Sequence, residues 1–517
     1  MDVSRRIAAG LLAATLITSA CGTLRPDADF TALQATTLSL GGNGVGAVSG
    51  GSIGGTVAQG GISPGTAGGP TLAPGRSGAV TGGADGRTGT GTGTAPAAGS
   101  TLPGALASGG GGGAEVNGAS DVGVTATTID IGNVTSVGGL AGPDQFPPYY
   151  FGAAAFFKDL NARGGINGRK VTFTTCDDGY TQNGNVKCVR DYVDNTKVFG
   201  FVSNACGVCD GLTYAADKGV PAIGGLATDF RSYALQHYWP AGGNPYPQNG
   251  KIGWNGKVYY GTGQFRFFAQ KYGIKKAGIV YYDNAAPSKN AALGFAEQMK
   301  AEGIEPFLYG LNVALPQYDS AVLDMKSRGV TGVWDAIDVV GNQNLCKSID
   351  SNGLALTAKV SNSAAWTQAV GRTFSSPCRK AIFSSEAPYS RPFSQTGNPE
   401  VAKFRAAMKR YFPDREDNLY QWTVDGWASA MWFTQAATAC GAQLTRACLE
   451  KNMDTAPFTA NGLWEARGNM KINFDTQKTI RQCTSIVQWD EPTGTFADRG
   501  DPDGNCYTTP LIGENLS

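Results

Sequence analysis

A glycine-rich tract divides this chain and limits where a packed core can form. Residues 41–120 contain 29 glycines in 80 residues, with only four charged residues and no aromatic one. Such a composition cannot bury enough apolar surface to offset the conformational entropy of the chain. We therefore expect a disordered, flexible linker with a reach on the order of 50 Å, from ~5–6 Å × √n. The folded region should begin at residue 121.

The N-terminus has the pattern of an export signal. Arg5 and Arg6 precede a short apolar run, 7–17, which is followed by the small residues Thr18-Ser19-Ala20. Cys21 comes next, and the four residues 18–21 resemble the bacterial lipobox, with Thr18 where that pattern usually has Leu. Two alternatives stay open: lipidation of Cys21, or ordinary signal cleavage after Ala20. The first predicts a protein anchored to the outer face of a bacterial cell membrane by lipid alone.

Charge and histidine content exclude several functions. Lys+Arg number 42 and Asp+Glu 41, so no overall basic field exists to attract a nucleic acid. His237 is the single histidine, which removes His-rich metal sites and any catalytic triad that is not built on that residue. We expect no nucleic-acid partner, no metal, no cofactor and no enzymatic activity.

The eleven cysteines suit an oxidising compartment outside the cytosol. Setting Cys21 aside leaves ten, an even number, and these fall into five neighbouring couples. The predicted disulfide bonds are Cys176–Cys188, Cys206–Cys209, Cys346–Cys378, Cys440–Cys448 and Cys483–Cys506. For the Cys206-Gly207-Val208-Cys209 spacing, a redox site or half of a zinc site is the alternative to a structural bridge.

Beyond residue 121, short β-rich runs alternate with helical stretches, which predicts an α/β protein with parallel sheets. The strand candidates are 129–134, 171–175, 198–202, 277–282, 333–337 and 381–384. One helix should carry Tyr150 and Phe157 on its core face, another should begin with Asn398 as N-cap, and a third should include Trp427. The aromatic-rich stretch 233–260 interrupts the alternation. Two α/β runs around this break predict two lobes with a cleft between them.

One segment carries a family resemblance. Residues 161–171, Asn-Ala-Arg-Gly-Gly-Ile-Asn-Gly-Arg-Lys-Val, lead into a strand that ends Cys176-Asp177-Asp178. Together with 217–223, Ala227-Thr228, 469–475 and 486–496, this pattern resembles periplasmic solute-binding proteins of the leucine/isoleucine/valine-binding type. The resemblance implies a type I fold, in which two doubly wound lobes are joined by three crossovers. The expected division is a signal peptide at 1–20, a lipid anchor and linker at 21–120, lobe I at 121–256 plus 391–482, and lobe II at 257–390 plus 483–517.

The same resemblance implies which positions hold a ligand. Lobe I should contribute Gln145, Phe146, Asn204, Ala205, Cys206, Leu226 and Thr228, and lobe II should contribute Ser288, Asp338, Ser363 and Trp366. Amino-acid binders have an acidic residue for the ligand ammonium where this chain reads Ser361 to Trp366. Either Asp338 takes that role or the ligand is not an α-amino acid, because an unpaired ammonium in a closed cleft is costly. Asp338 could equally be a solvated carboxylate, Trp366 a core residue and Thr228 a loop cap.

The resemblance implies a protein that captures a small solute and delivers it to the permease of an ABC importer. The alternative is a receptor of the same fold that reports a ligand to a membrane partner. An amphiphile with an apolar body and a carboxylate or amide is the expected ligand, because Phe146, Leu226 and Trp366 are apolar while Thr228 and backbone N–H groups are polar.

Overall fold

The computed structural model describes residues 24–25, 117–138, 145–207, 209–226, 230–241, 246–361, 370–386, 397–419, 421–458, 460–463, 472–500 and 505–515. All of these belong to one compact unit, Met1–Leu38 with Glu115–Ser517. Residues just before the expected start at 121 also pack on the folded region, since Ser120 Oγ donates a hydrogen bond to Leu444 O at 2.6 Å. Cys21 and residues 41–116 of the glycine-rich tract lie outside the described residues.

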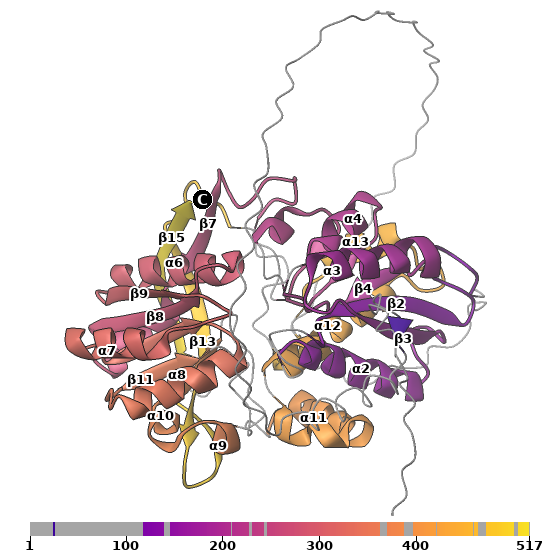
Figure 1. Cartoon of the computed structure of the whole chain (residues 1–517). Coiled ribbons are helices and arrows are strands. Elements are labelled where there is room, and N and C mark those ends of the chain that lie inside the picture. The colour runs from indigo at the N-terminus through magenta and orange to yellow at the C-terminus, as the bar shows by residue number, and fades with distance from the viewer. Residues whose placement is uncertain are drawn as a thin grey trace, which may run out of the picture. The chain divides into compact units, whose positions relative to one another are not determined.

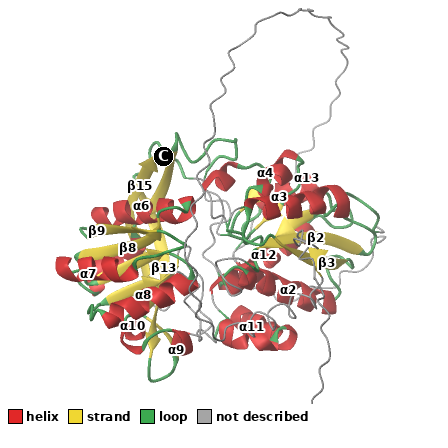
Figure 2. Ribbon diagram, viewed as in Figure 1, coloured by secondary structure: helices red, strands yellow, loops and turns green. Residues whose placement is uncertain are grey.

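The first sheet builds lobe I and has six strands in the order β1-β3-β2-β4-β5-β6. Five of these are parallel to one another, whereas β1 (Leu24–Arg25), inside the expected linker, pairs antiparallel with β3. The bounds are β2 (Thr128–Thr135), β3 (Lys170–Asp177), β4 (Gly200–Val202), β5 (Ala222–Ile223) and β6 (Tyr238–Trp239). Helices α3 (Gln182–Arg190) and α4 (Gly211–Asp217) cover one face, and α2 (Pro147–Ala162) covers the other (Figures 1 and 2).

The second sheet builds lobe II and is mixed. Strands β12 (Ile382–Glu386), β11 (Ala358–Ser361), β10 (Gly332–Ala336), β8 (Lys276–Tyr282) and β9 (Glu305–Leu311) are parallel. Beside β12, the antiparallel strands β13 (Thr479–Asp490), β15 (Asn505–Asn515) and β7 (Lys257–Gly261) follow in that order, and β14 (Thr495–Asp498) pairs with β13.

Two groups of helices pack on opposite faces of this second sheet. One core cluster joins α5 (Gly263–Lys271) and α6 (Ala286–Ala301) to the sheet. The other includes α7 (Tyr318–Arg328) and α8 (Val339–Ser351). The short helices α9 (Val370–Thr373) and α10 (Ser376–Lys380) follow β11. None of the described helices is both long enough and apolar enough to cross a membrane.

Among the described elements, the chain passes between the two sheets three times. It leaves the first sheet between β6 and β7 and comes back after β12 as α11 (Pro399–Tyr411), α12 (Gln421–Thr438) and α13 (Arg446–Thr455). It leaves again before β13. The close approach of α2 and α12 requires two glycines. A Cβ at Gly152 would lie only 1.9 Å from Thr423 O, and one at Gly426 would lie 2.1 Å from Tyr149 O. The two lobes and three crossovers expected from the sequence are therefore present.

The local predictions agree with these elements. Asn398 caps α11 by accepting hydrogen bonds from Glu400 N and Val401 N. Tyr150, Phe157 and Trp427 are buried in the core of lobe I. The ten cysteines form the five predicted disulfide bonds, Cys176–Cys188, Cys206–Cys209, Cys346–Cys378, Cys440–Cys448 and Cys483–Cys506.

Candidate functional site

The carboxyl ends of the lobe I strands meet at one edge of the first sheet, because these strands are parallel. Backbone hydrogen bonds join the segments that follow them: Ser136 N donates to Ala205 O at 3.0 Å, and Leu226 N donates to Asn204 O at 2.9 Å. The Asn204 side chain faces inward, and its Oδ1 accepts from Val134 N at 2.9 Å. The structure thus brings Asn204, Ala205 and Leu226 together, and the Asn204 amide oxygen accepts a hydrogen bond from the backbone of β2.

Two aspartates fix the turn that follows β3. Asp177 Oδ1 accepts hydrogen bonds from Val137 N at 3.0 Å and Gly179 N at 2.9 Å. Asp178 is 2% exposed and accepts from Ser136 Oγ, Tyr180 N and Asn185 Nδ2. Burial raises the pKa of Asp178, and the hydrogen bonds from Ser136 and Asn185 partly oppose that rise. These carboxylates hold loops in place, a role that the sequence analysis did not assign to them.

Four aromatic rings gather at this same edge of lobe I. Phe146, the residue before α2, stacks on Trp422 at 6.0 Å between ring centroids and lies 5.7 Å from Tyr180. Tyr149 lies 5.4 Å from Trp422, and its hydroxyl donates to Asp425 Oδ2 at 3.3 Å. The sequence analysis named only Phe146. Tyr149 and Trp422 lie on other faces of α2 and α12 than the core stripes, whereas Tyr180 lies in the turn after β3. The available sequence signal was Asp425, a buried acid within an apolar helix.

The position of the Tyr180 ring depends on a left-handed backbone conformation and on its close packing against Gly207. Its φ is +63°, in the left-handed region. A Cβ at Gly207 would lie 2.1 Å from Tyr180 Cε2, so this ring packs directly on the loop that the Cys206–Cys209 bridge closes. The C-x-x-C pair is a disulfide beside the candidate site. No group of three or more His, Cys, Asp or Glu suited to a metal ion occurs among the residues that the structure describes.

Lobe II presents its own strand ends. Ser288 ties two of them together, since its Oγ donates to Ala336 O at 2.5 Å and accepts from Tyr282 N at 2.7 Å. Asp338 is the N-cap of α8: Oδ1 accepts from Gly341 N and Oδ2 accepts from the Tyr282 hydroxyl, both at 2.8 Å. Asp338 is therefore not a freely solvated carboxylate, because both of its oxygens already accept hydrogen bonds within lobe II. Burial and the neighbouring Asp338 raise the pKa of Tyr282.

Residues from the two lobes meet at these edges. Val339 N, in the first turn of α8, donates to Gln145 Oε1 at 3.3 Å. A single apolar cluster contains Phe146, Tyr149 and Trp422 from lobe I together with Tyr282 and Ile337 from lobe II. Burial and the nearby Asp338 raise the pKa of the Tyr180 phenol. Thr228, Ser363 and Trp366 lie outside the described residues.

A family model described as periplasmic binding protein matches residues 128–495, which is more than half of the chain. The chain belongs to the periplasmic binding protein family. Members of this family bind small molecules outside the cytoplasm, and they are typically not enzymes. A comparison with curated protein sequences gives no significant match.

Solved structures share the fold at low sequence identity. A fatty acid ABC transporter substrate-binding protein from Thermomonospora curvata is 17% identical, with a TM-score of 0.56 over 75% of this chain and 94% of that one. A solute-binding protein from R. palustris in complex with benzoate is 15% identical, with a TM-score of 0.56 over 74% and 97%. A possible leucine/isoleucine/valine-binding protein from Rhodopirellula baltica is 14% identical, with a TM-score of 0.56 over 72% and 96%. These likenesses confirm the type I periplasmic-binding fold.

Proposed function

We propose that this protein is the solute-binding component of an ABC importer and that it captures a small solute between its two lobes. The observation that carries the proposal is the meeting of two sets of strand ends at the Gln145–Val339 hydrogen bond. Each lobe supplies polar and aromatic groups to this region. A solute held between them would favour the closed arrangement by its contacts to both halves.

The proposed site combines the sequence-predicted positions with the aromatic rings of lobe I. From lobe I, Gln145, Phe146, residues 204–206, Leu226 and Thr228 would contact the solute, together with Tyr180 and Trp422. From lobe II, Ser288, Asp338, Ser363 and Trp366 would complete the enclosure. Because the side-chain oxygens of Asn204 and Ser288 already bond to backbone groups, these two residues would act chiefly by shaping their turns.

The proposed ligand is a small amphiphile, amino-acid-like or an apolar acid or amide. Phe146, Tyr180 and Trp422, which pack on one another, would line the site with apolar surface for the body of such a ligand. Asp338 would attract an ammonium group, while backbone N–H groups would hold a carboxylate. Two proteins with this fold, one a fatty acid binder and one bound to benzoate, support a ligand with an apolar body and a carboxylate.

A thermal-shift screen tests this proposal. The panel contains amino acids, amides, aromatic acids and sugars, and any hit is then titrated by calorimetry. A true ligand raises the melting temperature further as its concentration rises, because it binds only the folded state. Binding by sugars alone, or a shift that does not grow with concentration, would contradict the proposed ligand class.

A matched pair of tyrosine variants locates the binding. Tyr180→Phe removes the phenolic hydroxyl near Asp338 and keeps the ring, and we expect a several-fold weaker affinity for a hit. Tyr214→Phe is the control, because that hydroxyl bonds to Asp194 on the surface of lobe I. Equal affinities in the two variants would remove Tyr180 from the site. Thr228→Val tests the remaining hydroxyl of lobe I in the same assay.

We also propose that residues 1–20 are removed on export, that Cys21 is lipidated, and that 21–120 tethers the head to the membrane. The lobe boundaries proposed are 121–256 plus 391–482 for lobe I and 257–390 plus 483–517 for lobe II. Replacement of Cys21 by Ser should move the protein from the membrane fraction to the soluble fraction. An unchanged distribution would favour simple cleavage after Ala20.

Deletion of the protein tests the alternative role as a receptor. Solute uptake that persists without the protein would favour a sensing role.

A further inference from the structure

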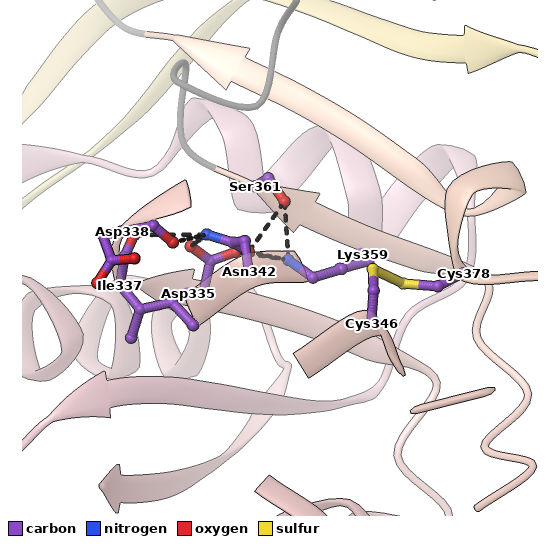
Figure 3. A network of polar contacts seen from close by, with 8 residues as sticks. All are labelled: Asp335, Ile337, Asp338, Asn342, Cys346, Lys359, Ser361 and Cys378. Carbon is purple, nitrogen blue, oxygen red and sulfur yellow. Dashed lines mark hydrogen bonds and ion pairs between the residues drawn. A yellow bond between two sulfur atoms is a disulfide. The ribbon is translucent and has the colours of Figure 1, made fainter. Parts of the chain in front are cut away.

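A fully buried ion pair lies beneath the lobe II half of the site (Figure 3). Lys359 Nζ on β11 and Asp335 Oδ2 on β10 are 2.8 Å apart, and both side chains are 0% exposed. Burial of two charges carries a desolvation penalty that their attraction offsets only when the geometry and the additional hydrogen bonds are good. Such a pair is weak evidence of added stability, so its presence points to another role.

Each donor of this network finds an acceptor. The Lys359 ammonium has three hydrogens. They go to Asp335 Oδ2, to Ser361 Oγ at 2.7 Å and to Asn342 Oδ1. Asn342 Nδ2 then donates to Asp335 Oδ1 at 2.8 Å and to Asp338 O at 3.2 Å. The charges compensate each other, so what the network provides is fixed geometry.

The hydrogen bonds of this network reach the residues of lobe II that would contact a solute. Asn342 reaches the carbonyls of Ile337 and Asp338, which form the turn between β10 and α8. Ser361 is the last residue of β11. The Cys346–Cys378 bridge lies beside the network in Figure 3 and joins the middle of α8 to α10. The hydrogen-bond network of the ion pair therefore holds the first turn of α8, and the disulfide anchors the middle of the same helix.

We infer that Lys359 is a positioning residue of the solute site, which acts through Asn342 and Ser361 to fix the first turn of α8 and the carboxyl end of β11. This inference rests on the proposed function, because the groups it fixes are Asp338 and Val339. A role in stability alone would not require hydrogen bonds to the carbonyls of this turn, since apolar residues pack well in a buried parallel strand.

Hydrogen exchange on the full chain tests the inference without any solute. The key variant is Lys359→Met with Asp335→Leu, which removes both charges together and avoids an unpaired buried charge. We expect at least tenfold faster exchange of the Gly341 and Asn342 amides, which bond to Asp338 Oδ1 and Asp338 O. The amides of Val333 and Trp334, in the middle of β10, should change less than twofold. Ser361→Ala should accelerate exchange at the end of β11 and leave Gly341 within twofold.

A second ion pair of lobe II serves as control. Arg266 Nε and Glu302 Oε2 are 2.9 Å apart, with side chains 24% and 8% exposed, and no described hydrogen bond links them to the α8 turn. Arg266→Met with Glu302→Leu should leave Gly341 exchange within twofold of wild type. The inference is overturned if the Lys359/Asp335 variant also stays within twofold, or if the control pair gives the same acceleration.

A binding measurement with L-leucine and benzoate as probes separates this inference from the proposed function. If either probe binds the wild type, the Lys359/Asp335 variant should bind it at least tenfold more weakly, whereas the Arg266/Glu302 variant should bind it unchanged. Equal affinities in wild type and the first variant would overturn the inference. If neither probe binds the wild type, the proposed ligand class fails, and the exchange experiment still decides the role of Lys359.

Discussion

The two lobes fasten the carboxyl ends of their strands by different chemistry. In lobe I, the buried Asp178 shares its charge among neutral donors: a hydroxyl, a backbone N–H and an amide. In lobe II, Asp335 faces the buried cation of Lys359. A carboxylate with neutral donors can lose one partner and keep the others. A buried ion pair that loses one member leaves an uncompensated charge, so lobe II depends more on a single residue.

The largest effect tests this difference directly. Lys359→Met should lower the free energy of unfolding by about 3–5 kcal/mol, because it leaves Asp335 buried and unpaired. Asp178→Asn should lower it by only about 1–2 kcal/mol, since an amide oxygen can still accept some of the same bonds. Urea unfolding of the two variants measures both values. Equal decreases in the free energy of unfolding would show that the Asp178 hydrogen bonds and the Lys359–Asp335 ion pair are equally important for stability.

Disulfide removal extends the comparison. The Cys346–Cys378 bridge of lobe II spans 32 residues, whereas the Cys206–Cys209 bridge of lobe I spans three. Chain-entropy estimates give about 4 kcal/mol for the former and about 2 kcal/mol for the latter. Paired Cys→Ser variants in calorimetric unfolding should follow that order. A larger loss of stability on removing the short bridge would indicate that loop length alone does not determine what these bridges contribute.

Helix caps offer a smaller contrast. Asn398 caps α11 on lobe I, and Asn398→Ala should reduce stability by about 1 kcal/mol. Asp338 caps α8 and also accepts the Tyr282 hydroxyl, so Asp338→Ala should cost about 2 kcal/mol. A double variant with Tyr282→Phe checks the second role. If Asp338→Ala costs the same in that background, the tyrosine bond adds nothing.

The smallest effect concerns pH in lobe II. Burial, with help from Glu297, raises the pKa of Glu514 from its ordinary 4.5 to about 7, and Tyr260 also lies nearby. The folded protein then holds a proton that the unfolded chain has released between these values. This contribution to stability is complete below about pH 4.5 and is lost as the pH rises through about 7. Melting temperatures of Glu514→Gln from pH 5 to 8 should therefore fall less than those of wild type.

Much of the fold could be predicted because its signals are local. The strand candidates 129–134, 171–175 and 277–282 coincide with β2, β3 and β8, and the Asn398-Pro399 pair marks the start of α11. Five disulfide pairs followed from proximity in the sequence. Strand β11 was missed because Lys359 interrupts its apolar pattern, and only its contacts with Asp335 and Asn342 make that lysine compatible with burial.

The candidate site was harder to predict. Asn204, Ala205 and Leu226 lie together at one edge because they follow parallel strands, and their contact with a ligand stays a prediction. Tyr180 and Trp422 were not foreseen, because Tyr180 sits in a turn with positive φ and Trp422 lies far away in the sequence, on a helix that joins lobe I only after the chain has built most of lobe II. Proximity of this kind depends on the crossovers and not on any local pattern.

The position of β15 has a consequence for how the protein matures. This last strand lies between β7, the first strand after the chain enters lobe II, and β13. Lobe I likewise needs α11–α13, which emerge after more than a hundred residues of lobe II. Neither lobe can complete its packing from one contiguous stretch of the chain. Both lobes can therefore be completed only when nearly the whole polypeptide is available for folding. Because contacts between such distant parts of the chain form slowly, we expect folding of both lobes to finish late.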